Sequence, residues 1–290
     1  MNTSIAHFNG KLAPIDEIRI SPLDRGFIFG DGVYEVIPVY GGVPLHAREH
    51  FERLQRSMDE IRLANPHTVE EWIALTRELL AHHPGNQSVY IQVTRGAPQK
   101  RDHVIPKDLE PTVFMMCYPL ASPSKDAIEK GVACVTARDF RWEKCHVKST
   151  SLLGNVLARQ ISADAGAAET ILIRDGHVTE ASASNVFIVK DGVVAAAPKD
   201  HLILLGITYE LLSKLAGDGA LKLEVRPITE AQMRAADEVW LSSSTKEVLA
   251  VTAIDGKPVG DGKPGPAFRR MHAAYQEYKA RLRNSSAVAA

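Results

Sequence analysis

The spacing of apolar residues predicts helices and strands in the first third of the chain. Between positions 51 and 61 an apolar residue recurs at steps of three and four, as in a helix with one buried face: Phe51, Leu54, Met58 and Ile61. Residues 33–40 read VYEVIPVY, and this run of β-branched and aromatic residues predicts a strand. Pro38 lacks a backbone N–H, so it indicates an edge position or a bulge in that strand.

Turn and capping signals mark further elements. Thr68 and Glu71 form a capping-box pattern, which predicts a helix that ends near residues 83–85. A helix is also expected to begin at Ile207, directly after Gly206. Four dipeptides predict hairpins: Asn9-Gly10, Asp175-Gly176, Asp191-Gly192 and Asp255-Gly256. The remaining pattern predicts strands over residues 88–94, 112–118 and 132–140 and helices over 151–165 and 267–283.

These elements predict an α+β fold in two domains. Strands and helices alternate without a regular βαβ rhythm, which argues against a doubly wound parallel sheet. A chain of 290 residues is also about twice the length of a typical single domain. The best linker candidate is PLASPSKD at residues 119–126, because it combines two prolines with small polar residues. We therefore expect an N-terminal domain over 1–118 and a C-terminal domain over 127–290.

Composition narrows the possible function classes. The 34 basic and 35 acidic residues give a formal net charge of −1, which is not the basic footprint of a typical nucleic-acid-binding protein. No apolar run approaches the roughly 18 residues of a membrane-spanning helix, and residues 1–10 do not resemble a signal peptide. The three cysteines lack CxxC spacing, so neither a disulfide framework nor a cysteine-built metal site is expected. The sequence favours a cytoplasmic enzyme without a metal ion.

Two residues are candidates for the chemistry itself. Lys148 precedes an apolar helix, where partial desolvation would lower its pKa and free its amine as a nucleophile. Glu180 lies among alanine and serine residues that allow a planar ligand to approach closely. When the local sequence is considered alone, a solvated side chain is the favoured interpretation for each residue.

Two further segments could hold an anion. The helix expected to begin at Ile207 and Thr208 offers backbone N–H groups and a favourable dipole to a phosphate. Ser244 lies in a run of four hydroxyl residues after an expected strand, which is either an anion cradle or a polar turn. Simple helix capping is the alternative for Thr208.

Taken in order along the chain, these motifs resemble one family. The chain is similar to the fold-type IV pyridoxal-phosphate enzymes, and most closely to the D-amino-acid aminotransferases among them. The similarity is strongest in five stretches: GDGVYE at 30–35, VTRG at 93–96, Lys148 with LLG at 152–154, residues 179–187, and GIT at 206–208. Several motifs in the same order are more specific than any one of them. The resemblance implies a two-domain fold-type IV structure.

The resemblance also assigns roles at the cofactor. The lysine that matches Lys148 forms the Schiff base with pyridoxal 5'-phosphate and moves the proton, and the glutamate that matches Glu180 pairs with the pyridine nitrogen. A carboxylate at that position keeps the ring cationic, so the ring can accept electrons. The phosphate would be held by Arg53, Ser244 and the backbone at Ile207 and Thr208, and Leu204 would pack beside the ring.

Three residues carry the implied substrate preference. Tyr34 matches a tyrosine of the D-amino-acid aminotransferases, and Arg101 and His103 match their Arg-x-His pair, which contacts the substrate α-carboxylate. A guanidinium suits bidentate binding of a carboxylate. The loop over residues 96–103 is one residue longer than the family pattern, so Lys100 is an alternative to Arg101.

These assignments imply transamination between a D-amino acid, such as D-alanine, and a 2-oxo acid, such as 2-oxoglutarate. The alternatives are a branched-chain L-amino-acid aminotransferase, an (R)-amine transaminase, an aminodeoxychorismate lyase and a non-catalytic binding protein of the same fold. The resemblance further implies a homodimer, in which Arg101 and His103 could reach the partner's site. Small-molecule substrates are the expected partners, with neither nucleic acid nor membrane.

Overall fold

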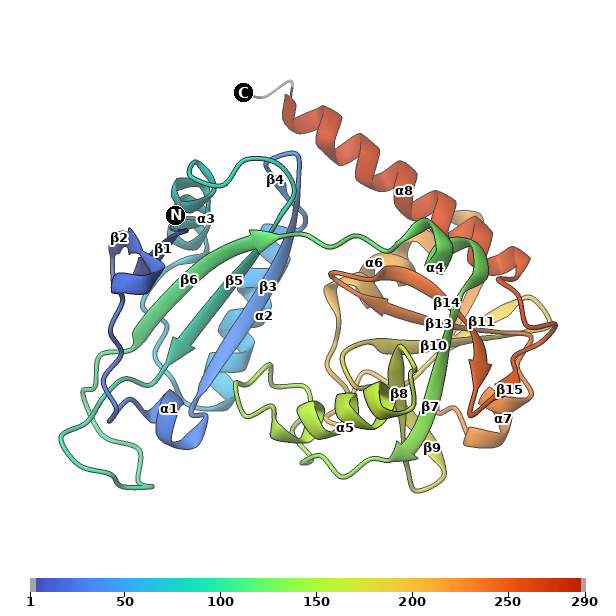
Figure 1. Ribbon diagram of the computed structural model, residues 1–290, viewed down its shortest axis with the longest axis horizontal. Helices are drawn as coiled ribbons and strands as arrows, with labels where there is room; N and C mark the ends of the chain where they lie inside the picture. The colour runs from blue at the N-terminus through green and yellow to red at the C-terminus, as the bar shows by residue number, and fades with distance from the viewer. Residues whose placement is uncertain (1–3, 288–290) are drawn as a thin grey trace. The chain divides into compact units, whose positions relative to one another are not determined.

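The computed structural model describes residues 4–287, apart from the side chains of residues 219, 220 and 284–287. Its contacts divide the chain into two compact units. The first unit contains residues up to Leu120 together with Val147–Leu152, and the second contains Ala121–His146 together with the chain from Leu153. Each unit combines helices with a β-sheet, which confirms the predicted α+β class (Figure 1).

The first unit contains a six-stranded sheet in the order β2-β1-β6-β5-β3-β4, in which every pair is antiparallel. Its strands are β1 (Ile5–Phe8), β2 (Lys11–Pro14), β3 (Gly32–Tyr40), β4 (Val43–Pro44), β5 (Gln87–Thr94) and β6 (Thr112–Pro119). Its helices are η1 (Ile15–Glu17), α1 (Arg25–Phe29), α2 (Ala47–Glu60) and α3 (Val69–Leu80).

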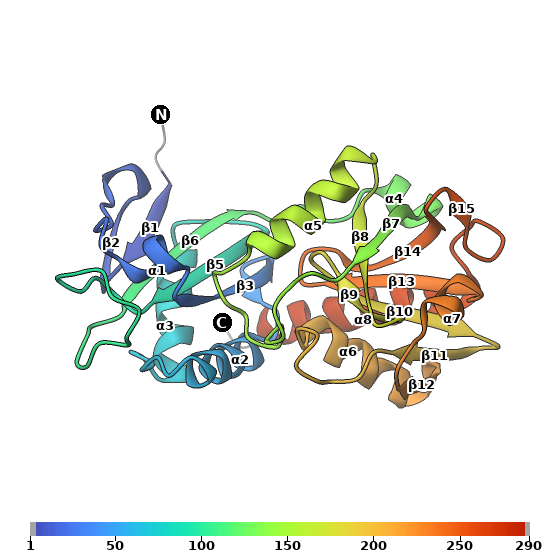
Figure 2. The same ribbon diagram turned by 90° about the horizontal axis from the view of Figure 1, so that it is seen from below.

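Helices α2 and α3 pack on one face of this sheet (Figures 1 and 2). The core between them contains the predicted apolar face of α2, with Phe51, Leu54 and Met58 fully buried, and it also contains Trp72 of α3. Thr68 and Glu71 form the predicted capping box at the start of α3. Strand β4 pairs only with Val39 and Tyr40, so Pro38 lies just beyond this ladder, where it is buried and its carbonyl accepts from the N–H of Leu45 at 2.9 Å.

The second unit contains a nine-stranded mixed sheet. Along its main path the order is β12-β11-β10-β13-β14-β7-β8-β9, and β15 pairs with β14. Its strands are β7 (Val132–Arg138), β8 (Glu169–Arg174), β9 (His177–Ala181), β10 (Asn185–Lys190), β11 (Val193–Ala196), β12 (Lys222–Val225), β13 (Glu238–Ser243), β14 (Glu247–Ile254) and β15 (Lys257–Pro258). Its helices are α4 (Lys125–Lys130), α5 (Leu153–Asp164), α6 (Ile207–Leu215), η2 (Ala216–Ala220), α7 (Glu230–Arg234) and α8 (Pro266–Ala287).

Helix α5 packs on β7 and β8, whereas α6 and α8 pack on β13 (Figure 2). The three predicted Asp-Gly turns connect β8 to β9, β10 to β11, and β14 to β15. Each turn has its aspartate and its glycine at positive φ, as hairpin turns of this type require. Strand β7 ends at Arg138, two residues before the predicted end, because Asp139 and Arg141 leave the ladder to enter a buried ion-pair cluster.

Lys148 belongs to the first unit, although the predicted domain limits counted it with the second. The backbone N–H of Tyr34 donates to the carbonyl of Lys148, and Val33 forms an isolated bridge with Ser149. These hydrogen bonds attach the segment 147–152 to the start of β3. Within residues 4–287, no helix is long and apolar enough to cross a membrane.

Candidate active site

Strand β3 presents two adjacent site residues to opposite faces of the first sheet. Side chains alternate along a strand, so Tyr34 and Glu35 point in opposite directions. Glu35 is fully buried beneath α2, whereas the ring of Tyr34 is half-buried and stacks on Tyr90 at 5.8 Å. A step of one residue along the strand therefore separates a buried acid from an aromatic surface.

Glu35 holds Arg53 and His50 in a buried cluster. Its carboxylate accepts hydrogen bonds from Nε of Arg53 at 2.7 Å and from a terminal nitrogen of Arg53 at 2.8 Å. The Nδ1 of His50 lies 2.7 Å from the same carboxylate. His50, Arg53 and Ser57 follow one another at steps of three and four, so they form one stripe of α2 beside its apolar face. This cluster fixes the direction of the Arg53 guanidinium.

The charges in this cluster determine its protonation. Burial alone would raise the pKa of Glu35, but Arg53 and His50 outweigh burial and hold that pKa far below its usual range. Burial also lowers the pKa of His50, although Glu35 opposes that effect. At neutral pH, Glu35 is therefore ionised.

The backbone of Lys148 is fixed from two sides. Its N–H donates to the hydroxyl of Ser57 at 3.2 Å, and its carbonyl accepts from the N–H of Tyr34 at 2.9 Å. The Nζ lies 4.3 Å from the centroid of the Tyr34 ring, and no residue within 4–287 forms an ion pair with it. Lys148 is thus half-buried, with its amine against an aromatic face and without an ion-pair partner among the described residues.

Arg101 and His103 also belong to the first unit. The guanidinium carbon of Arg101 lies 4.8 Å from the centroid of the Phe29 ring, and the His103 ring lies 5.1 Å from it. Both side chains are exposed. The longer loop therefore keeps the predicted Arg-x-His pair together on one aromatic residue.

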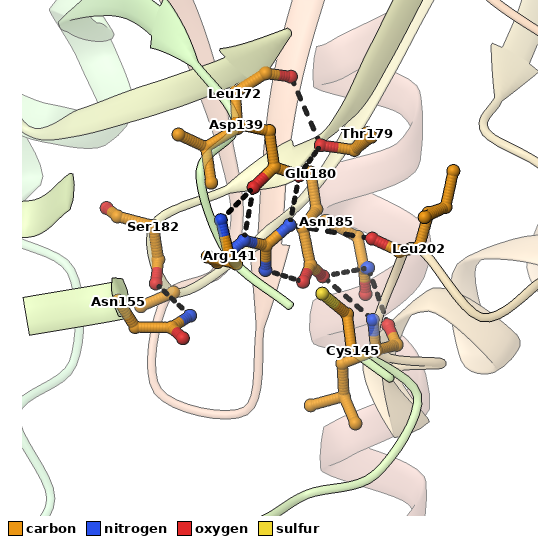
Figure 3. Close-up of polar contacts among 12 residues, drawn as sticks. Asp139, Arg141, Cys145, Asn155, Leu172, Thr179, Glu180, Ser182, Asn185 and Leu202 are labelled. Carbon is orange, nitrogen blue, oxygen red and sulfur yellow. Dashed lines mark hydrogen bonds and ion pairs between the residues drawn. The ribbon is translucent and has the colours of Figure 1, made fainter. Parts of the chain in front are cut away.

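Glu180, on β9, is the central acid of the second unit. It is 5% exposed, and it accepts hydrogen bonds from the N–H of Leu204 at 3.0 Å and from Nδ2 of Asn185 at 3.3 Å. Arg141 donates a hydrogen bond to the other carboxylate oxygen (Figure 3). Because a carboxylate offers about four lone-pair positions, Glu180 retains capacity to accept one more donor.

Arg141 divides its charge between two carboxylates. Its guanidinium donates at 3.0 and 2.9 Å to Asp139 as well as to Glu180, and it is buried with both of them (Figure 3). Burial raises the pKa of Glu180 to about 7, since Arg141 and the N–H of Leu204 offset only part of the desolvation. The acid is consequently sensitive to any further positive charge that approaches it.

Residues assigned to the phosphate lie at two turns of this unit. Helix α6 begins at Ile207, as predicted, and no side chain caps its first turn, which contains Thr208. Ser244 lies in the turn between β13 and β14, two residues after Ser242, which pairs with Asn185. Asn185 also donates to the carbonyl of Leu204 at 2.7 Å, so one amide connects β10 to the segment before α6. An uncapped helix start is suited to an anion.

The chemistry of these groups fits pyridoxal phosphate. The first unit supplies an unpaired amine at Lys148 and a fixed guanidinium at Arg53. The second unit supplies an acid with spare acceptor capacity at Glu180 and an uncapped helix start at Ile207.

Sequence patterns did not identify several residues of the two clusters as candidates. Glu35, His50 and Ser57 were missed, and so were Arg141 and Asn185. The spacing of His50, Arg53 and Ser57 on one helix was an available signal, because three polar residues on one stripe beside an apolar face need buried partners. Nothing local distinguishes Arg141, since its partner Glu180 is 39 residues away in the sequence.

Comparison with known proteins identifies relatives over almost the whole chain. D-alanine aminotransferase from Staphylococcus epidermidis is 39% identical over 271 residues, which cover 93% of this chain and 96% of the relative. D-alanine aminotransferase from Bacillus licheniformis is 40% identical over 271 residues, which cover 93% and 95% of the two chains.

Solved structures share the fold. The branched-chain aminotransferase of the archaeon Thermoproteus uzoniensis with norvaline has a TM-score of 0.87 and 26% identity, and the match covers 95% of this chain and 94% of that one. A branched-chain amino acid aminotransferase solved with pyridoxamine 5'-phosphate has a TM-score of 0.89 at the same identity, over 96% and 94% of the chains. The Escherichia coli branched-chain amino acid aminotransferase has a TM-score of 0.88 at 22% identity, over 95% and 94% of the chains, which shows a common fold alone.

A family model extends over most of both units. The amino-transferase class IV family matches residues 32–254, a range that includes every residue assigned above to the cofactor. The match confirms the resemblance derived from the sequence motifs and the predicted cofactor. The chain therefore belongs to the amino-transferase class IV family and is a pyridoxal-phosphate-dependent aminotransferase.

Proposed function

We propose that this enzyme transfers an amino group between a D-amino acid, such as D-alanine, and a 2-oxo acid, such as 2-oxoglutarate. The observation that carries the proposal is the ordered placement of Arg101 and His103 on Phe29. The D-alanine aminotransferases at 39–40% identity support the same substrate class. The proposed partners are therefore two small molecules, an amino-acid donor and a 2-oxo-acid acceptor.

Lys148 is the proposed catalytic residue. Bound pyridoxal phosphate supplies an aromatic ring that accepts the electrons released when the substrate loses its α-proton. The Nζ of Lys148 takes up that proton and later returns it. No residue within 4–287 forms an ion pair with Nζ, so no carboxylate of the described chain competes with the substrate for this amine. Tyr34 limits the volume that the amine can occupy, because its ring lies 4.3 Å from Nζ.

Besides Lys148, six further residues are proposed to bind the cofactor. Glu180 would accept a hydrogen bond that the protonated ring nitrogen donates, through its remaining acceptor capacity. The fixed guanidinium of Arg53, the first turn of α6 at Ile207 and Thr208, and the hydroxyl of Ser244 provide donors for the phosphate. The side chain of Leu204 supplies an apolar contact for the ring, since its backbone is held by Glu180 and Asn185.

Tyr34, Arg101 and His103 are proposed to bind the substrate α-carboxylate. A guanidinium and an imidazole beside each other offer several N–H donors to a single carboxylate. Holding that group fixes the direction of the Cα–H bond, which selects one enantiomer.

A panel of amino donors with 2-oxoglutarate tests the substrate class. The purified enzyme should form a 2-oxo acid from D-alanine and should not do so from L-leucine. Replacing Lys148 with alanine should abolish turnover while Lys144→Ala, an exposed neighbour, should not. Reaction with L-leucine alone would refute the D-amino-acid proposal, and an active Lys148→Ala enzyme would refute the role of the lysine.

A branched-chain L-amino-acid aminotransferase is the second candidate. It is favoured by the structural match to the branched-chain enzyme solved with pyridoxamine 5'-phosphate, with a TM-score of 0.89 and 26% identity. The same donor panel decides between the two, since the two classes act on opposite enantiomers. Amine donors and aminodeoxychorismate are added to the panel to test the two other enzyme alternatives, an (R)-amine transaminase and an aminodeoxychorismate lyase.

A homodimer and a cytoplasmic location are proposed as well. Four apolar side chains of α5 are 38–71% exposed at helical spacing, and a second copy would cover such a face: Leu153, Val156, Leu157 and Ile161. The three cysteines are free thiols, which suits a reducing compartment. Light scattering of the purified enzyme should give a mass of twice 31.7 kDa.

We also propose a domain boundary near residue 119, with the segment 147–152 assigned to the first unit.

A further inference from the structure

We propose that Arg25 is a positioning residue for substrate recognition: its guanidinium anchors the backbone of residues 102–104 and so holds Arg101 and His103 in place. The proposal rests on the proposed function, because it assumes that these two side chains bind the substrate carboxylate. It adds a residue that touches neither substrate nor cofactor in that scheme.

The guanidinium of Arg25 uses its donors on one short segment. One terminal nitrogen donates to the carbonyl of Asp102 and lies 3.4 Å from that of Val104, and the other lies 3.3 Å from the carbonyl of His103. Its Nε donates to Asp31 at 2.7 Å, so its charge is also balanced. The side chain of Arg25 is only 5% exposed. A buried arginine thus binds three successive carbonyls.

The anchored segment has little else to order it. Residues 95–111 contain no helix or strand, and the side chains of residues 99–105 are exposed, with Val104 at 72%. Ordering such a segment costs backbone entropy at every residue, so it needs fixed contacts. Three carbonyls held by one rigid guanidinium meet that need in the middle of the segment.

The side chains are aligned by the same short helix. Arg25 and Phe29 are four residues apart in α1 and therefore lie on one face, with the Arg25 guanidinium 4.9 Å from the Phe29 ring. Arg101 and His103 contact the same Phe29 ring. Arg25 consequently fixes the backbone of the segment, and Phe29 fixes the direction of its side chains.

Arg95 provides a matched control within the same cluster. Its Nε also donates to Asp31, at 2.8 Å, and its side chain is also 5% exposed. Its terminal nitrogens, however, donate to the carbonyls of Ile61 and Arg62 instead of the segment 102–104. Arg25→Lys and Arg95→Lys therefore weaken the same ion-pair cluster, but only the first releases the segment.

The experiment compares the two variants as holoenzymes. We expect Arg25→Lys to raise the KM for D-alanine and for the 2-oxo acid about tenfold or more, with a smaller change in kcat. Trypsin should cut Arg25→Lys faster after Lys100 and Arg101, and mass spectrometry identifies these sites. Arg95→Lys should change neither the KM nor these cleavage rates, and both variants should keep the visible absorbance of the bound cofactor.

Two results would overturn the inference. One is equal cleavage after Lys100 and Arg101 in the two variants, since Arg25 would then not anchor the segment. The other is faster cleavage in Arg25→Lys with an unchanged KM, since the anchored segment would then not serve the substrate. A wild-type enzyme without activity on any D-amino acid would instead refute the proposed function, and the cleavage rates would still decide whether Arg25 anchors the segment.

Discussion

Replacing Glu35 with glutamine tests whether the buried cluster around Arg53 is needed for stability. The substitution keeps the shape of the side chain but removes its charge. The Arg53 guanidinium, only 6% exposed, then loses the partner that accepts two of its hydrogen bonds at 2.7 and 2.8 Å. Breaking one partner of a buried ion pair typically costs about 3–5 kcal/mol, because the remaining charge is left in a poorly solvated place.

The expected loss can be measured by thermal unfolding of the apoprotein at pH 7. About 3–5 kcal/mol corresponds to a fall in Tm of roughly 5–8 °C for a chain of 290 residues, given an unfolding entropy of about 2.1 cal/mol/K per residue. Glu70→Gln is the matched control, since it removes a pair of the same type, with Arg48 on the same helix α2. That pair is at least half exposed on both sides, so its removal should leave Tm nearly unchanged.

The pH dependence has a defined sign. Arg53 and His50 hold the pKa of Glu35 in the folded protein below its ordinary value. The stability that ionised Glu35 contributes is therefore fully present at a pH above that ordinary pKa, and it is lost only as the pH falls below it. The difference between wild type and Glu35→Gln should therefore be constant from about pH 5 upward and should shrink in stronger acid. The double variant Glu35→Leu with Arg53→Met should recover much of the loss. A fall in Tm no larger than that of Glu70→Gln would show that the buried charge matters little.

Three other substitutions test the second unit. Burial raises the pKa of Glu180 to about 7. The free energy of unfolding of the apoprotein should therefore fall by up to about 3 kcal/mol, relative to that of Glu180→Gln, as the pH rises from about 4.5 to 7. A difference in Tm between the two proteins that does not vary with pH would contradict this. Gly206→Ala should weaken cofactor affinity in a spectroscopic titration, because a Cβ there would lie 2.4 Å from Oδ1 of Asn185, whereas Gly217→Ala, with open space around it, should not. Lys246→Met should lower stability by about 1–3 kcal/mol in urea unfolding, because it removes the 2.6 Å ion pair that Lys246 makes with the fully buried Glu169; an unchanged midpoint would show that the serine and backbone donors around Glu169 suffice.

Local signals in the sequence predicted the elements that depend on neighbouring residues. The capping box at Thr68 and Glu71 was identified because both partners lie within one turn of helix. The start of α6 at Ile207 was identified for a similar reason. The resemblance then identified the candidate residues, because the family motifs keep their order along the chain.

The pairings between distant residues could not be predicted in this way. Arg141 and Glu180 are 39 residues apart, and Arg25 and the carbonyl of His103 are 78 residues apart. Which arginine meets which acid depends on strand order and on where the chain leaves the sheet, and no short pattern contains that information. The assignment of Lys148 to the first unit has the same origin, because it depends on hydrogen bonds to Tyr34 and Ser57.

The two buried glutamates show how one residue type can be given different tasks. Glu35 receives the whole of one guanidinium edge and a histidine, so its pKa is lowered and it remains an anion that fixes Arg53. Burial raises the pKa of Glu180, and Arg141, which Glu180 shares with Asp139, offsets only part of that effect. An ionised acid whose charge is already balanced by a paired arginine gains little from a further cation, whereas an acid near the midpoint of its titration responds strongly to one. Burial together with the sharing of Arg141 therefore distinguishes Glu180 from Glu35, and this difference suits Glu180 to the positively charged ring that we propose it pairs with.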